Sequence, residues 1–184
     1  MKALLLTGPS GSGKTTLARL ILERYPQFAF SISATTRPPR PGEVPDRDYY
    51  FLSSEAFEAY IQQGEFIEWE ELFGGHRYGT LRRELERLKG LGKIPLFVKD
   101  VRGTLALRHF LGEGAYTLFI LPPSLSVLRQ RLVQRGIASP TELEERLARA
   151  EQEIAFLPQF DFVLYNDELE AAIERIGHLL HSGS

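Results

Sequence analysis

The chain has 184 residues, of which 43% are hydrophobic and 25% charged, a balance that excludes a disordered or fibrous protein and suits one well-cored domain. Its 22 basic and 24 acidic side chains leave a formal net charge of −2, so no global attraction to nucleic acid or to an anionic membrane is expected. The lack of cysteine excludes disulfides, thiolate metal sites and cysteine nucleophiles.

No apolar run approaches the roughly 20 residues needed to span a bilayer. The first residues carry one lysine and a short apolar run that leads directly into a glycine-rich segment, unlike a signal peptide. Together with the missing cysteines, this predicts a cytoplasmic protein whose partners are neither membranes nor nucleic acids. The oligomeric state, monomer or homodimer, is left open.

Short apolar runs alternate with helical patterns along the chain, which predicts a parallel sheet covered by helices. The first strand is expected at Ala3–Thr7, followed by a helix from about Lys14 to Tyr25 that Pro26 ends. Further core strands are expected at Phe28–Ile32, Ile94–Val98, Tyr116–Leu121 and Phe162–Tyr165, and a last helix at Leu169–Leu180.

Two stretches break this rhythm. Residues 33–79 are rich in proline, glycine, tyrosine and charge, and this composition predicts a small inserted lobe. Within it, short strands at Tyr49–Leu52 and Phe66–Leu72 flank a helix capped near Ser54. Residues 134–140 separate two arginine-rich helical segments, the second of which starts with the N-cap, N1 and N3 residues Ser139, Pro140 and Glu142.

The strongest motif is GPSGSGKT at Gly8–Thr15, a complete G-x-x-x-x-G-K-[ST] that follows a predicted strand and opens a helix. Its glycines let successive backbone N–H groups face a phosphate, and the helix N-terminus adds its positive end. Lys14 supplies a full charge near the β- and γ-phosphates, and the Thr15 hydroxyl can hold Mg²⁺. The motif therefore predicts a nucleotide site with Mg²⁺, and does not by itself indicate a reaction.

A second cluster places Arg37 and Arg40 three residues apart on a proline-stiffened segment that ends at Glu43. Two guanidinium groups at a fixed separation suit a phosphate. The alternative interpretation is a solvated surface loop whose charges aid solubility.

Four motifs occur in the order seen in guanylate kinases, which the chain therefore resembles: the phosphate loop, SISATTRPPRPGE at 31–43, FIEW at 66–69 and YGT at 78–80. The resemblance extends to Tyr165–Asp167 and implies phosphoryl transfer from MgATP to GMP, and to dGMP. It also implies an α/β P-loop fold, with a parallel five-stranded sheet flanked by helices. The implied parts are a core in 1–32, 81–125 and 153–184, an α+β GMP-binding lobe in 33–80, and a helical lid in 126–152.

Carried over residue by residue, the resemblance implies roles for most polar residues of these motifs. Guanine offers two adjacent donors, N1–H and the amino group, beside the acceptor O6, so a carboxylate accepts from it and a hydroxyl donates to it. Adenine presents the opposite pattern. The implied GMP-binding residues are Ser33, Arg37, Arg40, Tyr49, Glu68, Tyr78, Thr80 and Asp100, the last also able to position Mg²⁺ through water. The implied ATP-binding residues are Gly8, Pro9, Ser10, Gly11, Ser12, Gly13, Lys14, Thr15, Thr16 and Asn166.

The lid segment carries two arginine pairs, each on one helix face. The resemblance implies that lid arginines close over the ATP phosphates, and it favours Arg135 and Arg146 as catalytic residues with Lys14 and Arg40. Surface ion pairs remain an alternative, because Glu142 and Glu145 lie four residues before Arg146 and Arg149. For Arg149 and Arg131 the two interpretations are balanced.

The chain departs from the family pattern at two places. It has Val98-Lys99-Asp100 where an acidic residue, an aliphatic one and aspartate are usual, and His76-Arg77 where Asn-Tyr usually precedes Tyr78. These changes put guanine specificity in question. The histidines, His76, His109, His178 and His181, show no metal-ligand spacing.

Three alternatives to this activity remain open. A related kinase of a phosphorylated sugar such as ribose bisphosphate should lack the joint set of Ser33, Arg37, Arg40, Glu68 and Tyr78. A catalytically dead protein-interaction module has no use for Lys14. A GTPase switch should carry an Asn-Lys-x-Asp motif, which this sequence lacks.

Overall fold

The computed structural model describes residues 2–134, 136, 139–167 and 169–182. Its centre is a parallel five-stranded sheet in the order β2-β7-β1-β8-β9. All five residues of the central strand β1 are buried, because helices cover both faces of such a sheet, and its sequence is accordingly an unbroken apolar run ending in Thr7. The strands are β1 Ala3–Thr7, β2 Phe28–Phe30, β7 Ile94–Val98, β8 Ala115–Leu121 and β9 Phe162–Tyr165.

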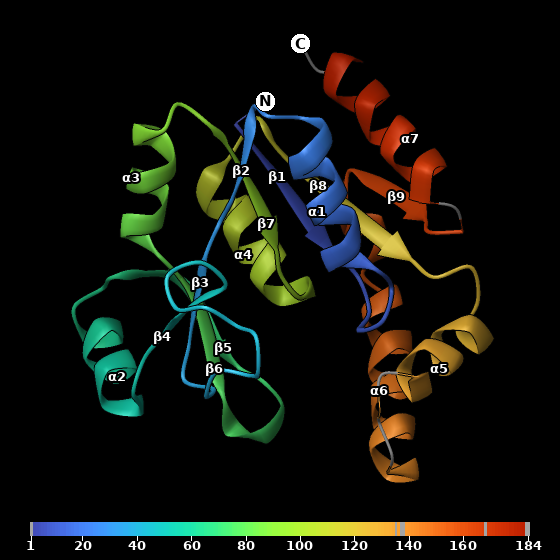
Figure 1. Ribbon diagram of the computed structural model, residues 1–184, viewed down its shortest axis with the longest axis horizontal. Coiled ribbons are helices and arrows are strands. Elements are labelled where there is room, and N and C mark those ends of the chain that lie inside the picture. The colour runs from blue at the N-terminus through green and yellow to red at the C-terminus, as the bar shows by residue number, and fades with distance from the viewer. Residues whose placement is uncertain (1, 135, 137–138, 168, 183–184) are drawn as a thin grey trace.

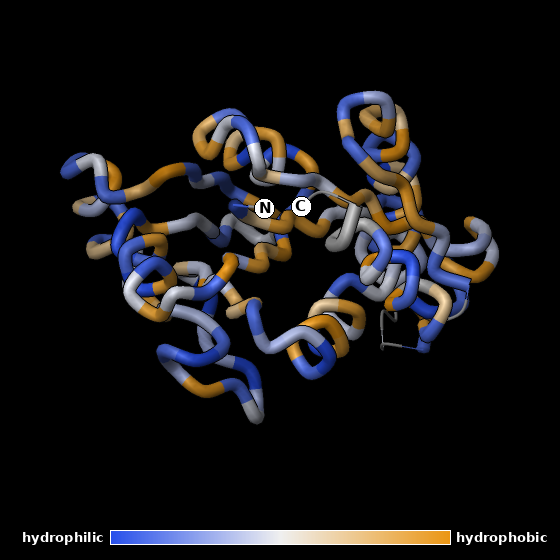
Figure 2. Tube along the Cα trace, turned by 90° about the horizontal axis from the view of Figure 1, so that it is seen from above, coloured by the Kyte–Doolittle hydropathy of each residue, from blue (hydrophilic) through white to orange (hydrophobic). Residues whose placement is uncertain are grey.

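Helices cover both faces of this sheet (Figure 1). On one face, α1 (Lys14–Arg24) and α7 (Leu169–Ser182) pack on alternate β1 residues such as Leu6. On the other face, α3 (Arg82–Gly90) and α4 (Val101–Leu111) pack around Leu5. Figure 2 shows the central strands as mainly hydrophobic and the helices as two-sided. The predicted α/β fold with a five-stranded parallel sheet is confirmed.

A second sheet, in the order β4-β3-β6-β5, forms a small lobe with α2. Its own core is built from Ala34, Phe57, Phe66 and Leu81. The Ser53 side chain caps α2 by accepting from the backbone N–H of Ala56 at 3.1 Å, one residue before the predicted cap. The elements are β3 Ser33–Thr35, β4 Tyr49–Phe51, α2 Ser54–Gln62, β5 Phe66–Glu71, a 3₁₀ turn at Phe73–Gly75 and β6 Arg77–Leu81.

Two helices, α5 (Leu125–Gln134) and α6 (Pro140–Ile154), pack against each other through leucines such as Leu128 and Leu143. The predicted start of α6 is confirmed, with the Ser139 side chain accepting from the N–H of Glu142. A 3₁₀ turn at Leu157–Gln159 leads on to β9. Figure 1 shows the lobe and this helical pair on opposite sides of one end of the core sheet. The domain bounds stated above stay a prediction.

The observed elements differ from the predicted ones mainly at their ends. β2 stops at Phe30 rather than Ile32, β8 begins one residue early, and α7 runs to Ser182. The strands β3 and β6 were not predicted. β2 stops early because the chain leaves the core sheet there: Ser31 N still donates to Leu96 O, whereas Ile32 N donates to a side chain of α3. No helix in the part of the chain that the structure describes has the length and apolar character to cross a bilayer.

The α3 side chain that accepts from Ile32 N is Glu84, a fully buried carboxylate at the junction of core and lobe. It accepts from Ile32 N at 2.8 Å, from the Tyr50 hydroxyl at 2.8 Å and from Arg87 at 2.7 and 3.0 Å. Glu84→Gln is expected to lower the free energy of unfolding by about 2 kcal/mol, because hydrogen bonds to a buried charge are weakened. Urea unfolding measures this, with the exposed neighbour Glu86→Gln as control; equal stability of the two variants would contradict it.

Candidate active site

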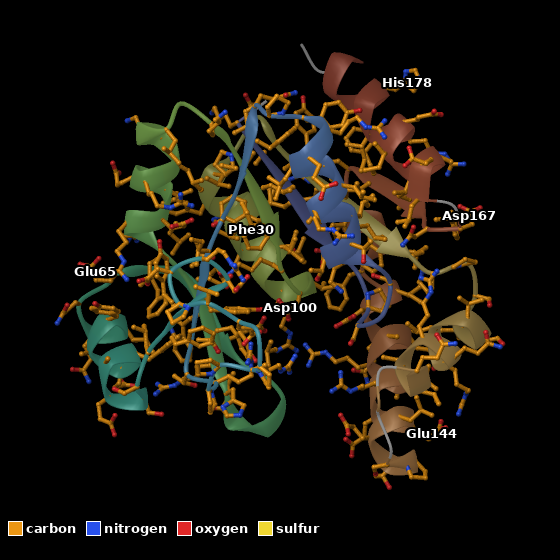
Figure 3. All side chains as sticks on the ribbon, viewed as in Figure 1. Phe30, Glu65, Asp100, Glu144, Asp167 and His178 are labelled. Atoms are coloured by element: carbon orange, nitrogen blue, oxygen red, sulfur yellow. The ribbon has the colours of Figure 1, made fainter. Side chains whose placement is uncertain are left out.

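A cavity of about 350 Å³ lies where the phosphate loop, the lobe and α6 meet. Figure 3 shows Asp100 between the lobe and the helical pair. Among the predicted site residues, those lining the cavity are Gly8, Ser10, Gly11, Gly13, Lys14, Thr15, Ser33, Tyr49, Glu68, Tyr78, Asp100 and Arg146. The residues Pro9, Ser12, Thr16, Arg37, Arg40, Thr80 and Asn166 are not among its lining. Arg135 lies outside the described residues.

The phosphate loop connects β1 to α1. Lys14 Nζ donates to the backbone oxygens of Gly8 at 2.5 Å and Pro9 at 2.8 Å, so the ammonium group lies within the curl of the loop. Asn166, at the end of β9, supports the loop from behind by donating to Ser12 O at 2.8 Å. Gly13 has a φ of 97°, and a Cβ there would collide with Asn166 Nδ2. Glycine at this position is therefore required by both backbone conformation and packing.

Three predicted base-reading residues meet at the lobe side of the cavity, and Lys99 joins them. The Thr80 hydroxyl donates to Glu68 Oε1 at 2.6 Å. Lys99 Nζ lies 3.1 Å from the same oxygen and donates to Ser33 Oγ at 2.8 Å. The Lys99 and Glu68 side chains are 9% and 6% exposed, so this is a buried ion pair. In the sequence, Lys99 stands out only as a departure from the family pattern.

A pair of carboxyl groups, Glu70 with Asp100, lies beside this cluster. Asp100 caps α4 by accepting from Gly103 N at 2.8 Å, and its other oxygen lies 3.3 Å from Arg149. Burial, a hydrogen bond with Asp100 and the charges of Asp100 and Glu68 raise the pKa of Glu70 to about 9. Sequence reasoning missed Glu70, although the alternation of β5 puts it on the same face as Glu68, two residues earlier.

The raised pKa of Glu70 makes stability depend on pH. The folded chain binds this proton more tightly than the unfolded chain, whose glutamate has a pKa near 4.5, so stability falls as pH rises from about 4.5 to about 9. Glu70→Gln removes that loss, and we expect a melting temperature about 2–4 °C above wild type at pH 8, corresponding to a solvent-screened effect of roughly 1 kcal/mol. Thermal unfolding at pH 5 and pH 8 measures it; a difference independent of pH would contradict the assignment.

In the segment predicted to hold the acceptor phosphate, Arg37 and Arg40 do not share the arrangement that the sequence predicts. Arg37 is buried and forms a bidentate ion pair with Glu43 at 2.9 Å for each bond. This pairing raises the pKa of Arg37 and lowers that of Glu43. Arg40 is exposed and uses its backbone N–H to donate to Glu43 at 2.7 Å. The two guanidinium groups thus do not form a matched pair here, because Glu43 engages one of them.

Two tyrosines beside the Arg37 segment, Tyr49 of β4 and Tyr78 of β6, line the cavity. The Tyr49 and Tyr78 rings meet edge to face with centroids 6.2 Å apart. The Arg37 guanidinium lies 5.2 Å from the centroid of the Tyr49 ring, a cation–π contact. Burial raises the pKa of Tyr49, which keeps its hydroxyl a hydrogen-bond donor.

Three arginines of the segment predicted to form a lid contact acidic neighbours, the site or both. Arg146 pairs with Glu142 as expected for helix neighbours, and also donates to Ser10 Oγ of the phosphate loop at 3.2 Å. Arg149 pairs with Glu153 at 3.0 Å and with Asp100, rather than with the predicted Glu145. In addition, Arg131 contacts backbone oxygens of the phosphate loop and of Asn166 at 3.5 and 3.4 Å.

The guanylate kinase family model matches residues 1–183. The chain belongs to the guanylate kinase family. A guanylate kinase of Thermosynechococcus vestitus is 46% identical over 170 residues, covering 92% of this chain and 88% of that protein. One of Bacteroides fragilis is 43% identical over 171 residues, covering 93% and 84%. The crystal structure of guanylate kinase from Anaplasma phagocytophilum superposes with a TM-score of 0.79 at 33% identity, covering 98% of this chain and 84% of that one.

Enzymes of the guanylate kinase family use ATP, so the fit of a metal ion to this cavity matters. Thr15 and Asp100 both line the cavity, and hydroxyl and carboxylate oxygens are the hard donors that Mg²⁺ prefers. Across the described residues, no three His, Asp or Glu side chains cluster in a way that would hold a metal. This donor set fits an ion carried largely by nucleotide phosphates rather than one held in a protein cage.

Proposed function

We propose that this cavity transfers the γ-phosphoryl group of MgATP to GMP, giving ADP and GDP. As a member of the guanylate kinase family, the chain is an ATP:GMP phosphotransferase. The observation that carries the assignment to this cavity is its lining: Lys14 of the phosphate loop and Glu68 of the lobe face the same space. One site can therefore hold a triphosphate donor and a nucleotide acceptor together.

In this proposal, catalysis consists of positioning and charge neutralisation. The acceptor phosphate is already an anionic nucleophile near neutral pH, so in-line transfer needs no general base. Lys14, Arg40 and Arg146 would neutralise the transferring phosphoryl group, with Arg135 added from the lid. The contact of Arg146 with Ser10 supports its part, since Ser10 belongs to the phosphate loop and lines the cavity.

The acceptor phosphate would be bound by Arg37, Arg40, Tyr49 and Tyr78. Arg37 must then exchange Glu43 for a phosphate, which its fork geometry matches equally well. When bound, Mg²⁺ supplies positive charge to the donor phosphates; Thr15 would hold it directly and Asp100 through water. Both nucleotides are cytoplasmic metabolites, which supports the predicted cytoplasmic location.

Two of the alternatives, the sugar-phosphate kinase and the interaction module, lack support in the cavity. A sugar-phosphate acceptor gives no purpose to Glu68 and Thr80, which form a polar cluster suited to a base edge. A non-catalytic interaction module gives no purpose to Lys14, whose ammonium group lies within the phosphate loop, bonded to its backbone oxygens.

An assay of ADP release with ATP and Mg²⁺ tests the assignment. The acceptor panel is GMP, dGMP, AMP, CMP, UMP and ribose bisphosphate. We expect GMP and dGMP to be the preferred acceptors. Turnover with the sugar and none with GMP would overturn the substrate assignment.

A further inference from the structure

Lys99 connects the core to the lobe at the cavity wall. Its backbone N–H donates to Leu6 O at 3.1 Å, which extends the pairing of β7 with β1 by one link and fixes where the side chain starts. The side chain then reaches Ser33 of β3 and Glu68 of β5, and all three residues line the cavity. Because only 9% of its side chain is exposed, Lys99 is not an ordinary surface lysine.

The chemistry of an ammonium group decides what these two partners can do. Ammonium can only donate, so the Ser33 oxygen accepts from Lys99 and the one hydrogen of the Ser33 hydroxyl is left for another partner. Glu68, as the anionic member of the ion pair, can only accept. Lys99 occupies one of the two lone pairs of Ser33 Oγ, and its positive charge favours a carbonyl oxygen of the base over an amino group beside that hydroxyl. It thereby biases Ser33 toward donating into the cavity and keeps Glu68 an acceptor.

Thr80, unlike Ser33, cannot act as a hydroxyl donor toward the cavity. Its single hydroxyl hydrogen is used in the 2.6 Å bond to Glu68 Oε1, so it is not available to donate to a base oxygen. The resemblance had implied a hydroxyl donor to O6, and this geometry leaves Ser33 for that task. Thr80 and Lys99 both contact Oε1 of Glu68, so Oε2 is the oxygen with more acceptor capacity left for a base.

The resulting order of groups, a donor at Ser33 and an acceptor at Glu68, complements O6 and N1–H of a 6-oxopurine. It opposes adenine, whose 6-amino group would face the Ser33 hydrogen and whose bare N1 would face a carboxylate. We propose that Lys99 is a specificity-determining positioning residue, which favours 6-oxopurine monophosphates by biasing Ser33 toward donating and by keeping Glu68 an acceptor. This inference rests on the proposed function and deepens it.

Replacing Lys99 with residues of different hydrogen-bond capacity tests the proposal. The Gln side chain carries both a donor and an acceptor, so Lys99→Gln frees Ser33 to reverse, whereas Lys99→Arg remains a donor-only cation. For Lys99→Gln we expect kcat/KM to fall about tenfold for GMP and by the same factor for IMP, with no fall for AMP. IMP is included because it shares O6 and N1–H with GMP. Lys99→Arg should restore the GMP-to-AMP ratio to within about threefold of wild type.

The matched control is Lys93→Gln, at the other end of β7. Its ammonium donates to Pro26 O at 2.6 Å on the exposed surface, so its loss should leave the ratio unchanged. A merely structural role for Lys99 predicts that GMP, IMP and AMP efficiencies fall together, and that result overturns the proposal. An unchanged GMP-to-AMP ratio in Lys99→Gln overturns it as well.

Ser33→Ala keeps the test decisive if Lys99→Gln does not fold, since it leaves the ion pair intact. The proposal requires the same fall of about tenfold for GMP and IMP and none for AMP; any other pattern overturns it. Wild type in the same assay separates the two levels of argument. No GMP turnover by wild type overturns the proposed function and this inference with it, whereas normal turnover with an unaltered ratio in the variants overturns this inference alone.

Discussion

Glu68→Gln is expected to lower kcat/KM for GMP by about 10³-fold while changing KM for ATP by less than about twofold. The carboxylate accepts from the base, and the amide places N–H donors where N1–H and the amino group of guanine need acceptors. The same change removes the anionic partner of Lys99, whose side chain is 9% exposed. A buried ammonium without its partner should cost about 3 kcal/mol of folding free energy.

Steady-state assays with each nucleotide varied, together with urea unfolding, measure both effects. The matched control is Glu71→Gln, because Glu71 lies on the same strand but is exposed on the opposite face. Equal losses for GMP and ATP would remove Glu68 from the base site.

Lys14→Met is expected to reduce kcat by about 10³-fold and to weaken ATP binding, with little change in melting temperature. The ammonium lies within the phosphate loop, bonded to the backbone oxygens of Gly8 and Pro9, where the β- and γ-phosphates of a donor would be cradled. Methionine fills a similar volume without the charge, so the loss reports electrostatic stabilisation of the transferring phosphoryl group.

Single-turnover phosphoryl transfer and calorimetric titration with MgATP measure the two effects separately. Lys89→Met, an exposed lysine near the end of α3, is the control. Activity of Lys14→Met within tenfold of wild type would show that the backbone of the loop neutralises the phosphates without it.

The sequence was sufficient to predict the core sheet because its strands are buried on both faces and therefore appear as continuous apolar runs. β1 and β7 are predicted to the residue, at Ala3–Thr7 and Ile94–Val98. β3 and β6 escaped prediction because each is short or half polar, and β6 contains Gly79 and Thr80. Their pairing depends on partners far along the chain, which no local pattern records.

In the candidate site, too, the parts encoded by a local motif were predictable, and the parts that depend on tertiary contacts were not. The phosphate loop is a contiguous segment whose spacing specifies its geometry, so it was predictable. The ion pair between Lys99 and Glu68 joins the residue that follows β7 of the core sheet to a residue of the lobe sheet. The pairing of Arg37 with Glu43 depends on how the loop between them turns. Glu70 was within reach of sequence reasoning through strand alternation alone, but its raised pKa depends on burial beside Asp100.

The contact between the phosphate loop and α5 has a consequence for how substitutions at Gly11 should be interpreted. With a φ of 87°, Gly11 sits so that a Cβ would come within 3.1 Å of Leu128 and 3.3 Å of Leu132. Intolerance to mutation here would usually be ascribed to the ligand. Instead, α5 packs against the loop, and the positive φ together with the close approach of the two leucines disfavours a side chain at residue 11 in the folded protein itself, before any nucleotide binds.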